Sequence, residues 1–346
     1  MRHNFLLCLL LGAPLLVTGC GDINDPVISN PVITTTAIAP ATLSISWAKA
    51  SDSNTSASAL VYKVYVSGLN PAYQSFDTLG EVEAGTLVQT LTDAGIATIS
   101  SGIVAGSAYY VNIVVEDEDR NKALYEPLGE YFHAGQVSYY PFNGNTNDVE
   151  TTTPNSLVVA TGLALPNVTS DRFSHAGSAY NFAPATPQCL QSNAVVGINS
   201  NAARSVSFWV QSSNTSAGIR RAAFAWGDAN TTGANFGASE DGVGSTWTAW
   251  LGGTADVPTT GTVTSSWEHW VVGYNGANIF AYKNGASVAN AAAALSTGIT
   301  ALLYVGCGSS AGTLVSPYQG NIDDVRVFNL ALNSIDVTNL YTVTRP

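Results

Sequence analysis

The sequence predicts an all-β protein, and three features support this prediction. Charged residues make up only 10% of the 346 residues, whereas an average soluble protein has about a quarter. The chain holds 32 glycines and is rich in turn-forming and β-branched residues, while helix-favouring residues are few. Short runs that alternate between apolar and polar residues recur along the chain, as half-buried strands require.

The N-terminus has the pattern of an export signal that ends at a cysteine. Residues 1–4 carry one cation, and residues 5–17 form an apolar run that is too short to span a membrane. Small residues then lead to Cys20, and this order resembles the lipobox of bacterial lipoproteins. The resemblance implies a signal peptide at 1–19, acylation of Cys20 and a place in the cell envelope, with Gly21 favouring the outer membrane. The alternative is an ordinary cleaved signal followed by an unrelated cysteine.

Residues 20–30 contain Asp, Asn, Pro and Ser with little periodicity. This composition predicts a flexible tether between the membrane and the first folded domain.

Residues 31–134 contain the first series of predicted strands. Residues 43–47 place Leu43, Ile45 and Trp47 on one face, residues 61–66 form a second strand, and residues 106–115 form a later one. These segments resemble a fibronectin type III domain, an immunoglobulin-like β-sandwich. The resemblance implies that Trp47 lies in the core. It also implies that Tyr109 or, preferably, Tyr110 closes a corner by bonding to the backbone.

Residues 136–346 predict a second, larger β domain. Asn-Gly pairs at 275–276 and 284–285 are strong hairpin signals, and Asn333 with Asp336 gives the pattern of a helix capping box. Four motifs follow in order: Tyr-Pro-Phe-Asn-Gly at 140–144, Ser-Phe-Trp-Val at 207–210, Trp-Glu-His-Trp at 267–270 and Ile-Asp-Asp-Val-Arg at 322–326. They resemble a laminin-G-like domain of the concanavalin A-like jelly-roll superfamily. The resemblance implies two antiparallel sheets packed face to face, with loops carrying any binding site.

Charge and motif patterns exclude several function classes. The net charge is −12 and the 12 basic residues are scattered, so nucleic acid is not expected as a partner. Some jelly-roll relatives are glycosidases, but the acidic runs at 116–119 and 240–241 are interpreted as turns. His269 is interpreted as a hydrogen-bonded core residue. The tryptophans at 209, 267 and 270 are interpreted as packing residues. We therefore expect no enzymatic activity.

Two cysteines remain after the signal and the acylated residue are set aside. Cys189 and Cys307 are predicted to form a disulfide, since an exported protein lies in a compartment where disulfides persist. A loop of that length contributes about 4–5 kcal/mol in the chain-entropy model. The alternative is two free buried thiols.

Calcium is the metal that the resemblance allows, because some laminin-G-like domains bind it at the edge of the sandwich. Asp148 and Asp323 are the candidate ligands. The alternative is that Asp148 caps a turn and Asp324 pairs with Arg326.

Glycan recognition is the favoured activity, since an aromatic ring stacks on the apolar face of a sugar. The candidate residues are Trp226, Trp247 and Trp250, with Asp228 beside the first. If residues 247–250 form a strand, Trp247 and Trp250 point to opposite faces. The alternative is that these rings only pack in the core.

These patterns together predict a lipid-anchored protein in which a fibronectin-like spacer carries a laminin-G-like recognition domain. The favoured function is non-catalytic binding of a glycan or another surface polymer, in adhesion or substrate capture. The second hypothesis is a structural or protein-interaction subunit of an envelope assembly. A third, weaker one is a divergent glycoside hydrolase or lyase that uses Glu240 or Asp241.

Overall fold

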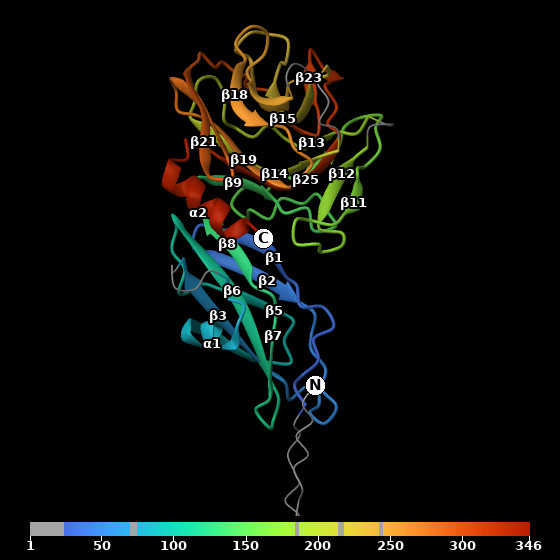
Figure 1. Ribbon diagram of the computed structural model, residues 1–346, viewed down its shortest axis with the longest axis vertical. Helices are drawn as coiled ribbons and strands as arrows, with labels where there is room; N and C mark the ends of the chain where they lie inside the picture. The colour runs from blue at the N-terminus through green and yellow to red at the C-terminus, as the bar shows by residue number, and fades with distance from the viewer. Residues whose placement is uncertain (1–23, 70–74, 184–186, 214–217, 242–244) are drawn as a thin grey trace, which may run out of the picture.

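Two β-sandwiches follow one another along the chain (Figure 1). The structure is a computed structural model that describes residues 24–69, 75–183, 187–213, 218–241 and 245–346. The expected signal peptide and Cys20 lie outside the described residues. No helix within the described ranges is long and apolar enough to cross a membrane.

The N-terminal sandwich packs a three-stranded sheet against a five-stranded one. The first sheet has the order β1-β2-β5, with β1 at Ile33–Ala39, β2 at Thr42–Trp47 and β5 at Ile96–Ile99. The second has the order β4-β3-β6-β7, with β3 at Val61–Gly68, β4 at Thr86–Thr92, β6 at Ser107–Glu116 and β7 at Lys122–Leu124. Strand β8, Leu128–Phe132, also pairs with β6, and the short helix α1, Leu79–Ala84, precedes β4.

The predicted alternation in β2 is confirmed by its burial. Leu43, Ile45 and Trp47 are buried while the serines between them are not. The Trp47 ring lies 5.8 Å from that of Tyr62 on β3, so the inward faces of the two sheets meet at these rings. This apolar contact holds the sandwich together.

The predicted tether is attached to this sandwich over its described part. The amide of Val27 donates to the carbonyl of Ser51 at 2.7 Å, and the Ser51 amide donates back at 3.0 Å. Ile28 packs against the core. The prediction of a free tether up to residue 30 is therefore wrong, because Val27 and Ile28 find backbone and apolar partners that composition does not reveal.

The C-terminal sandwich packs a seven-stranded sheet against an eight-stranded one. The first has the order β10-β13-β22-β15-β16-β17-β18. Its strands are β10 at Leu157–Val159, β13 at Leu190–Ser192, β22 at Leu303–Val305, β15 at Arg221–Gly227, β16 at Asn235–Glu240, β17 at Thr246–Trp250 and β18 at Val257–Thr262. The second has the order β11-β12-β25-β14-β19-β20-β21. Its strands are β11 at Asn167–Thr169, β12 at Ala179–Phe182, β25 at Gly320–Phe328, β14 at Arg204–Ser212, β19 at Glu268–Tyr274, β20 at Asn278–Lys283 and β21 at Ala286–Ala292. Strand β9, Gln136–Tyr140, pairs with β25, and a separate ribbon joins β23, Gly308–Ser310, to β24, Thr313–Val315.

Local signals in this domain are confirmed. Asn284 and Gly285 join β20 to β21 and both have positive φ, as a tight hairpin turn requires. Asn333 caps the helix α2, Ser334–Thr344, and Asp336 completes the capping box. The helix ends at Thr344.

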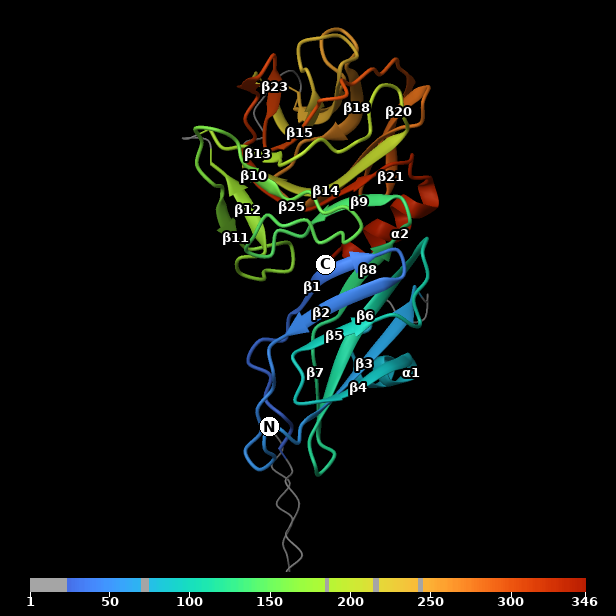
Figure 2. The same ribbon diagram turned by 180° about the vertical axis from the view of Figure 1, so that it is seen from behind.

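The two sandwiches share an interface that α2 fills (Figure 2). Val337, Leu340 and Val343 of α2 form one buried cluster with Tyr110 and Tyr131 of the N-terminal domain. The Tyr110 hydroxyl donates to the carbonyl of Thr342 at 3.1 Å. The hydroxyl of Tyr110, which the resemblance expects to close a corner of its own domain, thus bonds to the backbone of the other domain.

A buried ion pair crosses the same interface. Arg326 of β25 donates to the Glu130 carboxylate of β8 at 2.8 Å, and both side chains are at most 1% exposed. The Arg326 guanidinium also lies 3.7 Å from the centre of the Tyr139 ring. The ion pair thus joins β8 of the N-terminal sandwich to β25 of the C-terminal one.

Candidate functional site

The three candidate sugar-binding tryptophans are buried. Trp226 and Trp247 are each 1% exposed and lie between the two sheets of the C-terminal domain. Trp250 is 3% exposed and packs in a separate alanine-rich cluster, with the Arg220 guanidinium 5.2 Å from its ring. Trp247 and Trp250 thus pack in different clusters. The prediction that these tryptophans contact a ligand is wrong, because strands β15 to β17 are central in their sheet and bury large rings on their faces.

Asp228 follows β15 in a partly exposed turn. Its carboxylate accepts hydrogen bonds from the Thr231 hydroxyl at 2.8 Å and from the Asn230 amide at 3.1 Å. The Thr231 hydroxyl, followed by this amide, lowers the pKa of Asp228. Asp228 therefore stabilises a turn, and the Trp226 ring predicted to act with it is enclosed in the core.

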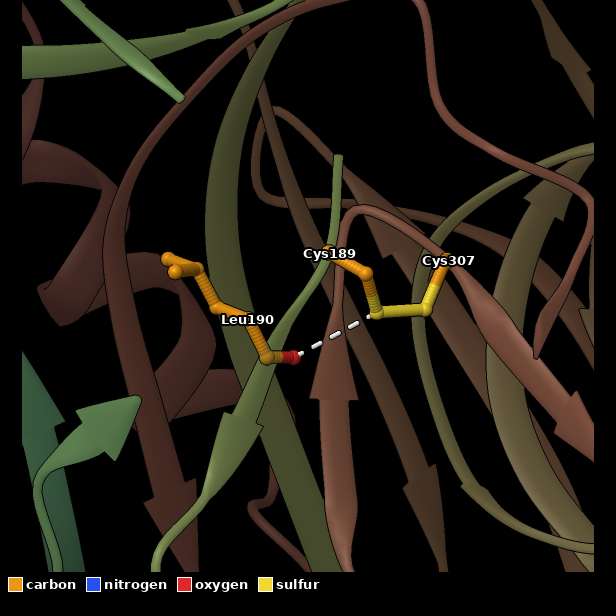
Figure 3. The surroundings of a disulfide bond; sticks show 3 residues. All are labelled: Cys189, Leu190 and Cys307. Atoms are coloured by element: carbon orange, nitrogen blue, oxygen red, sulfur yellow. Dashed lines mark hydrogen bonds between the residues drawn. A yellow bond between two sulfur atoms is a disulfide. The ribbon is translucent and has the colours of Figure 1, made fainter. Parts of the chain in front are cut away.

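Cys189 and Cys307 form a disulfide, as predicted (Figure 3). Their Cα atoms are 5.5 Å apart, and the bond joins the residue before β13 to the turn after β22. The Cys189 sulfur lies 3.6 Å from the carbonyl oxygen of Leu190. Both cysteines are buried with Ala160, so the bond has a structural role.

The candidate calcium ligands do not fit a calcium ion. The Asp148 carboxylate accepts hydrogen bonds from the amides of Tyr139, Glu150 and Asn155 at 2.8, 3.0 and 2.9 Å. Asp148 therefore caps a turn, as the alternative interpretation held. Asp323 binds the Arg172 guanidinium at 2.7 Å. These positively polarised N–H groups lie where a cation would have to approach the carboxylates. Within the described ranges, no three Asp, Glu, His or Cys side chains are grouped so that they could hold a metal ion.

Arg172 is held by two adjacent carboxylates. Asp324 binds it at 2.5 Å, and the Tyr139 hydroxyl donates to the same carboxylate. Asp324 has a φ of +49° at a point where β25 holds one more residue than β14, so a bulge brings both carboxylates to one guanidinium. Arg172 and Arg326 hold the pKa of Asp324 low against burial, while burial and Asp324 raise that of Asp323. The predicted pairing of Asp324 with Arg326 is therefore wrong, since Arg326 binds Glu130.

A cleft of about 600 Å³ lies beside the ion pairs of Arg172, and we call it the aromatic cleft because of its lining. Its walls include Trp209, Trp267 and Tyr341 from the C-terminal domain and Tyr110 from the N-terminal one. The Tyr341 ring on α2 stacks 6.0 Å from that of Trp209. This stacking fixes the orientation of Tyr341 at the cleft wall.

Trp267 differs from the other tryptophans. It is partly exposed, and among the described residues its ring contacts no other ring and its indole N–H has no hydrogen-bond partner. Each of the other six contacts a second ring or a guanidinium. The prediction that Trp267 is a core residue is wrong, because it precedes the first residue of β19 and lies at the domain boundary.

A second, smaller pocket of about 270 Å³ adjoins the aromatic cleft, and we call it the acidic pocket. His175 lies in its wall and joins the two domains, with Nε2 2.7 Å from Glu126 and Nδ1 3.2 Å from Asp171. Asp171 and then Glu126 raise the pKa of His175 above its ordinary value, against the effect of burial. Phe173, which is 40% exposed, lines both the pocket and the cleft.

One feature of the sequence indicates this site, although none of the motifs considered above includes it. Residues 171–175 contain three ionisable side chains in a chain that is only 10% charged. Such a concentration indicates either an ion-pair network or a binding loop. Here it is both, since Arg172 is buried in ion pairs while Phe173 and His175 reach the pocket.

Residues 186–338 match the family described as the concanavalin A-like lectin/glucanases superfamily. This match covers most of the second sandwich, in which two antiparallel sheets face each other. The C-terminal domain is a concanavalin A-like jelly roll. No curated protein sequence matches the chain.

Several solved structures resemble the chain. Domain 4 of an extracellular arabinanase from Geobacillus stearothermophilus, solved with arabinotriose, is 18% identical with a TM-score of 0.44, over 60% of this chain and 98% of that one. A Trypanosoma rangeli sialidase is 14% identical with a TM-score of 0.44, over 68% of this chain and 43% of that one. The binding domain of botulinum neurotoxin DC, solved with rat synaptotagmin II, is 12% identical with a TM-score of 0.44, over 60% and 51%. The chain thus spans about half or less of the last two.

Within the jelly roll, Glu240 is not part of a turn. It is the last residue of β16 and fully buried, where it binds Arg221 at 2.5 Å and accepts a hydrogen bond from Ser212. Burial raises the pKa of Glu240 to about 7. Because a catalytic carboxyl group must reach its substrate, this burial argues against Glu240 as a glycosidase residue.

Proposed function

We propose that this protein is a lipid-anchored, non-catalytic binding protein whose jelly roll binds a glycan in the aromatic cleft. The observation that carries the proposal is Trp267, a partly exposed ring in a cleft of about 600 Å³, whose indole N–H has no hydrogen-bond partner in the part of the chain that the structure describes. An indole offers an apolar face for a sugar ring and a hydrogen-bond donor at its edge. A cleft of this size with rigid walls suits a short saccharide segment.

The match to a lectin and glucanase family supports a saccharide as the ligand class. The rigidity of the cleft supports it further, because Tyr341 is stacked and Trp209 donates its indole N–H to the Thr344 hydroxyl at 3.1 Å. Walls that are ordered before binding reduce the entropy lost when a ligand binds.

The remaining parts of the proposal concern the rest of the chain. Acylation of Cys20 would attach the protein to the cell envelope, with the outer membrane favoured. We further propose that the N-terminal sandwich is a fibronectin type III domain. Support comes from its strand order, in which β1, β2 and β5 share one sheet and β3, β6 and β7 share the other, as in immunoglobulin-like folds.

The test is retention of the protein on gels that contain soluble polysaccharides, with Trp267→Ala beside the wild type. Loss of the stacking ring is expected to weaken binding about tenfold, which equals about 1.4 kcal/mol. Ile299→Ala is the matched control, because Ile299 is an apolar side chain that is 74% exposed and lies outside the cleft. Unchanged retention of Trp267→Ala, or no retention of the wild type on any polymer, would contradict the proposal.

A further inference from the structure

The acidic pocket and the aromatic cleft adjoin each other, and we call the two together the groove. Pro127, Gly129, Phe173 and Val343 line both of them. A saccharide that lies against Trp267 and continues past Phe173 would reach the acidic pocket.

The walls of this groove come from both domains. Thr35, Glu126 and Leu128 of the N-terminal domain face Asn143 and His175 of the jelly roll across the acidic pocket. The pocket does not exist in either domain alone, so the N-terminal domain supplies part of the surface that a ligand would contact.

The separation of the two walls is fixed by close packing. A Cβ atom at Gly129 would lie 1.7 Å from the carbonyl oxygen of Val343, so β8 and the end of α2 meet where only glycine fits. The buried ion pair between Arg326 and Glu130 joins β8 to β25 across the same interface. Walls held by such close packing lower the entropy cost of binding.

The charge of the acidic pocket selects among saccharides. It is lined by four carboxyl groups and two basic side chains: Glu126, Asp171, Asp323, Asp324, Arg172 and His175. The chain as a whole has a net charge of −12. Arg172 offsets part of the charge of Asp323 and Asp324, so the exposed Glu126 is the carboxylate that a ligand with carboxylate or sulfate groups would meet. Like charges at close range oppose binding.

We propose that the two domains together form one binding groove for a neutral saccharide chain, with acidic saccharides excluded. This inference rests on the proposed function, since it assumes that the aromatic cleft binds a glycan. It adds the contribution of the N-terminal domain and the charge class of the ligand.

The first test measures retention of the full chain on neutral and acidic polysaccharides. The neutral set is glucan, xylan, mannan, arabinan and galactan, and the acidic set is polygalacturonate, alginate and heparin. Retention on at least one neutral polymer, with at least tenfold weaker retention on every acidic one, is the expected result. Equal or stronger retention on an acidic polymer overturns the inference.

The second test places a charge change at the pocket. Glu126→Arg reverses the charge of an exposed side chain in the N-terminal domain, and Glu118→Arg makes the same change at an exposed hairpin tip of that domain, outside both cavities. We expect Glu126→Arg to weaken binding of the neutral polymer at least fivefold and to strengthen binding of polygalacturonate at least threefold. Glu118→Arg should leave both affinities as in the wild type.

The outcomes separate the two proposals. If Trp267→Ala loses binding while Glu126→Arg behaves like Glu118→Arg, the aromatic cleft binds glycan but the composite groove is wrong. If no polymer in either set is retained, both proposals fail.

Discussion

The tryptophans of the seven-stranded sheet and the tryptophan of the aromatic cleft differ in their surroundings. The Trp247 ring lies 5.0 Å from that of Trp270 and is 1% exposed, while Trp267 is partly exposed and contacts no other ring among the described residues. Both directly follow hydroxyl-bearing residues in the sequence, and both are followed by a polar residue, Thr248 or Glu268. The difference shows that position in the fold decides the role of a tryptophan. A tryptophan inside an inner strand of the sheet packs in the core, whereas one just before a strand at the domain boundary can contact a ligand.

The largest expected effect distinguishes these two classes by stability. Trp247→Ala should lower the free energy of unfolding by about 4 kcal/mol, because it leaves a cavity in the core of the jelly roll. Trp267→Ala should lower it by less than about 1 kcal/mol, because the side chain is already partly solvated. Urea unfolding followed by circular dichroism measures both. Similar losses for the two variants would show that Trp267 is a core residue after all.

The next effect tests whether the groove depends on the rigid interface. Glu130→Ala leaves the Arg326 guanidinium buried without its carboxylate and should cost about 3 kcal/mol of unfolding free energy. Because the Arg326 guanidinium keeps its contact with the Tyr139 ring, we expect a loss of unfolding free energy near the lower end of the range for a broken buried ion pair.

The control for this variant is an exposed ion pair in the same domain. Lys49 and Asp93 lie 2.9 Å apart with nearly half of each side chain exposed, so Lys49→Ala should cost less than about 1 kcal/mol. Thermal unfolding of both variants measures the difference. Equal costs would mean that the Arg326 pair does not fix the interface.

The smallest effect concerns the polar end of the groove. Because Asp171 and Glu126 raise the pKa of His175, its protonated form stabilises the folded protein. This contribution is complete below the ordinary pKa of about 6.5 and is lost as the pH rises through the higher pKa of the folded state. Between pH 6 and 9 the wild type should lose up to about 1 kcal/mol more unfolding free energy than His175→Asn. Parallel pH profiles would show that His175 does not join the domains through its charge.

Local rules predicted most of the strands and turns but not the site. The alternation at Leu43, Ile45 and Trp47, the turn at Asn284 and Gly285, and the cap at Asn333 depend on neighbours a few residues away. Tyr110 shows the limit of such rules, since its hydroxyl bonds to Thr342, which lies 232 residues further along the chain.

The sequence by itself determined the all-β class, the jelly roll, the disulfide between Cys189 and Cys307, and the helix that ends the described chain. These features follow from side-chain periodicity, turn chemistry, cysteine number and a set of motifs in order. Only the tertiary structure decided which aromatic rings are accessible and which carboxylates face Arg172. The physical reason is that exposure and ion pairing depend on how β8, β25 and α2 pack across the domain interface, and those contacts join residues that local patterns treat as unrelated.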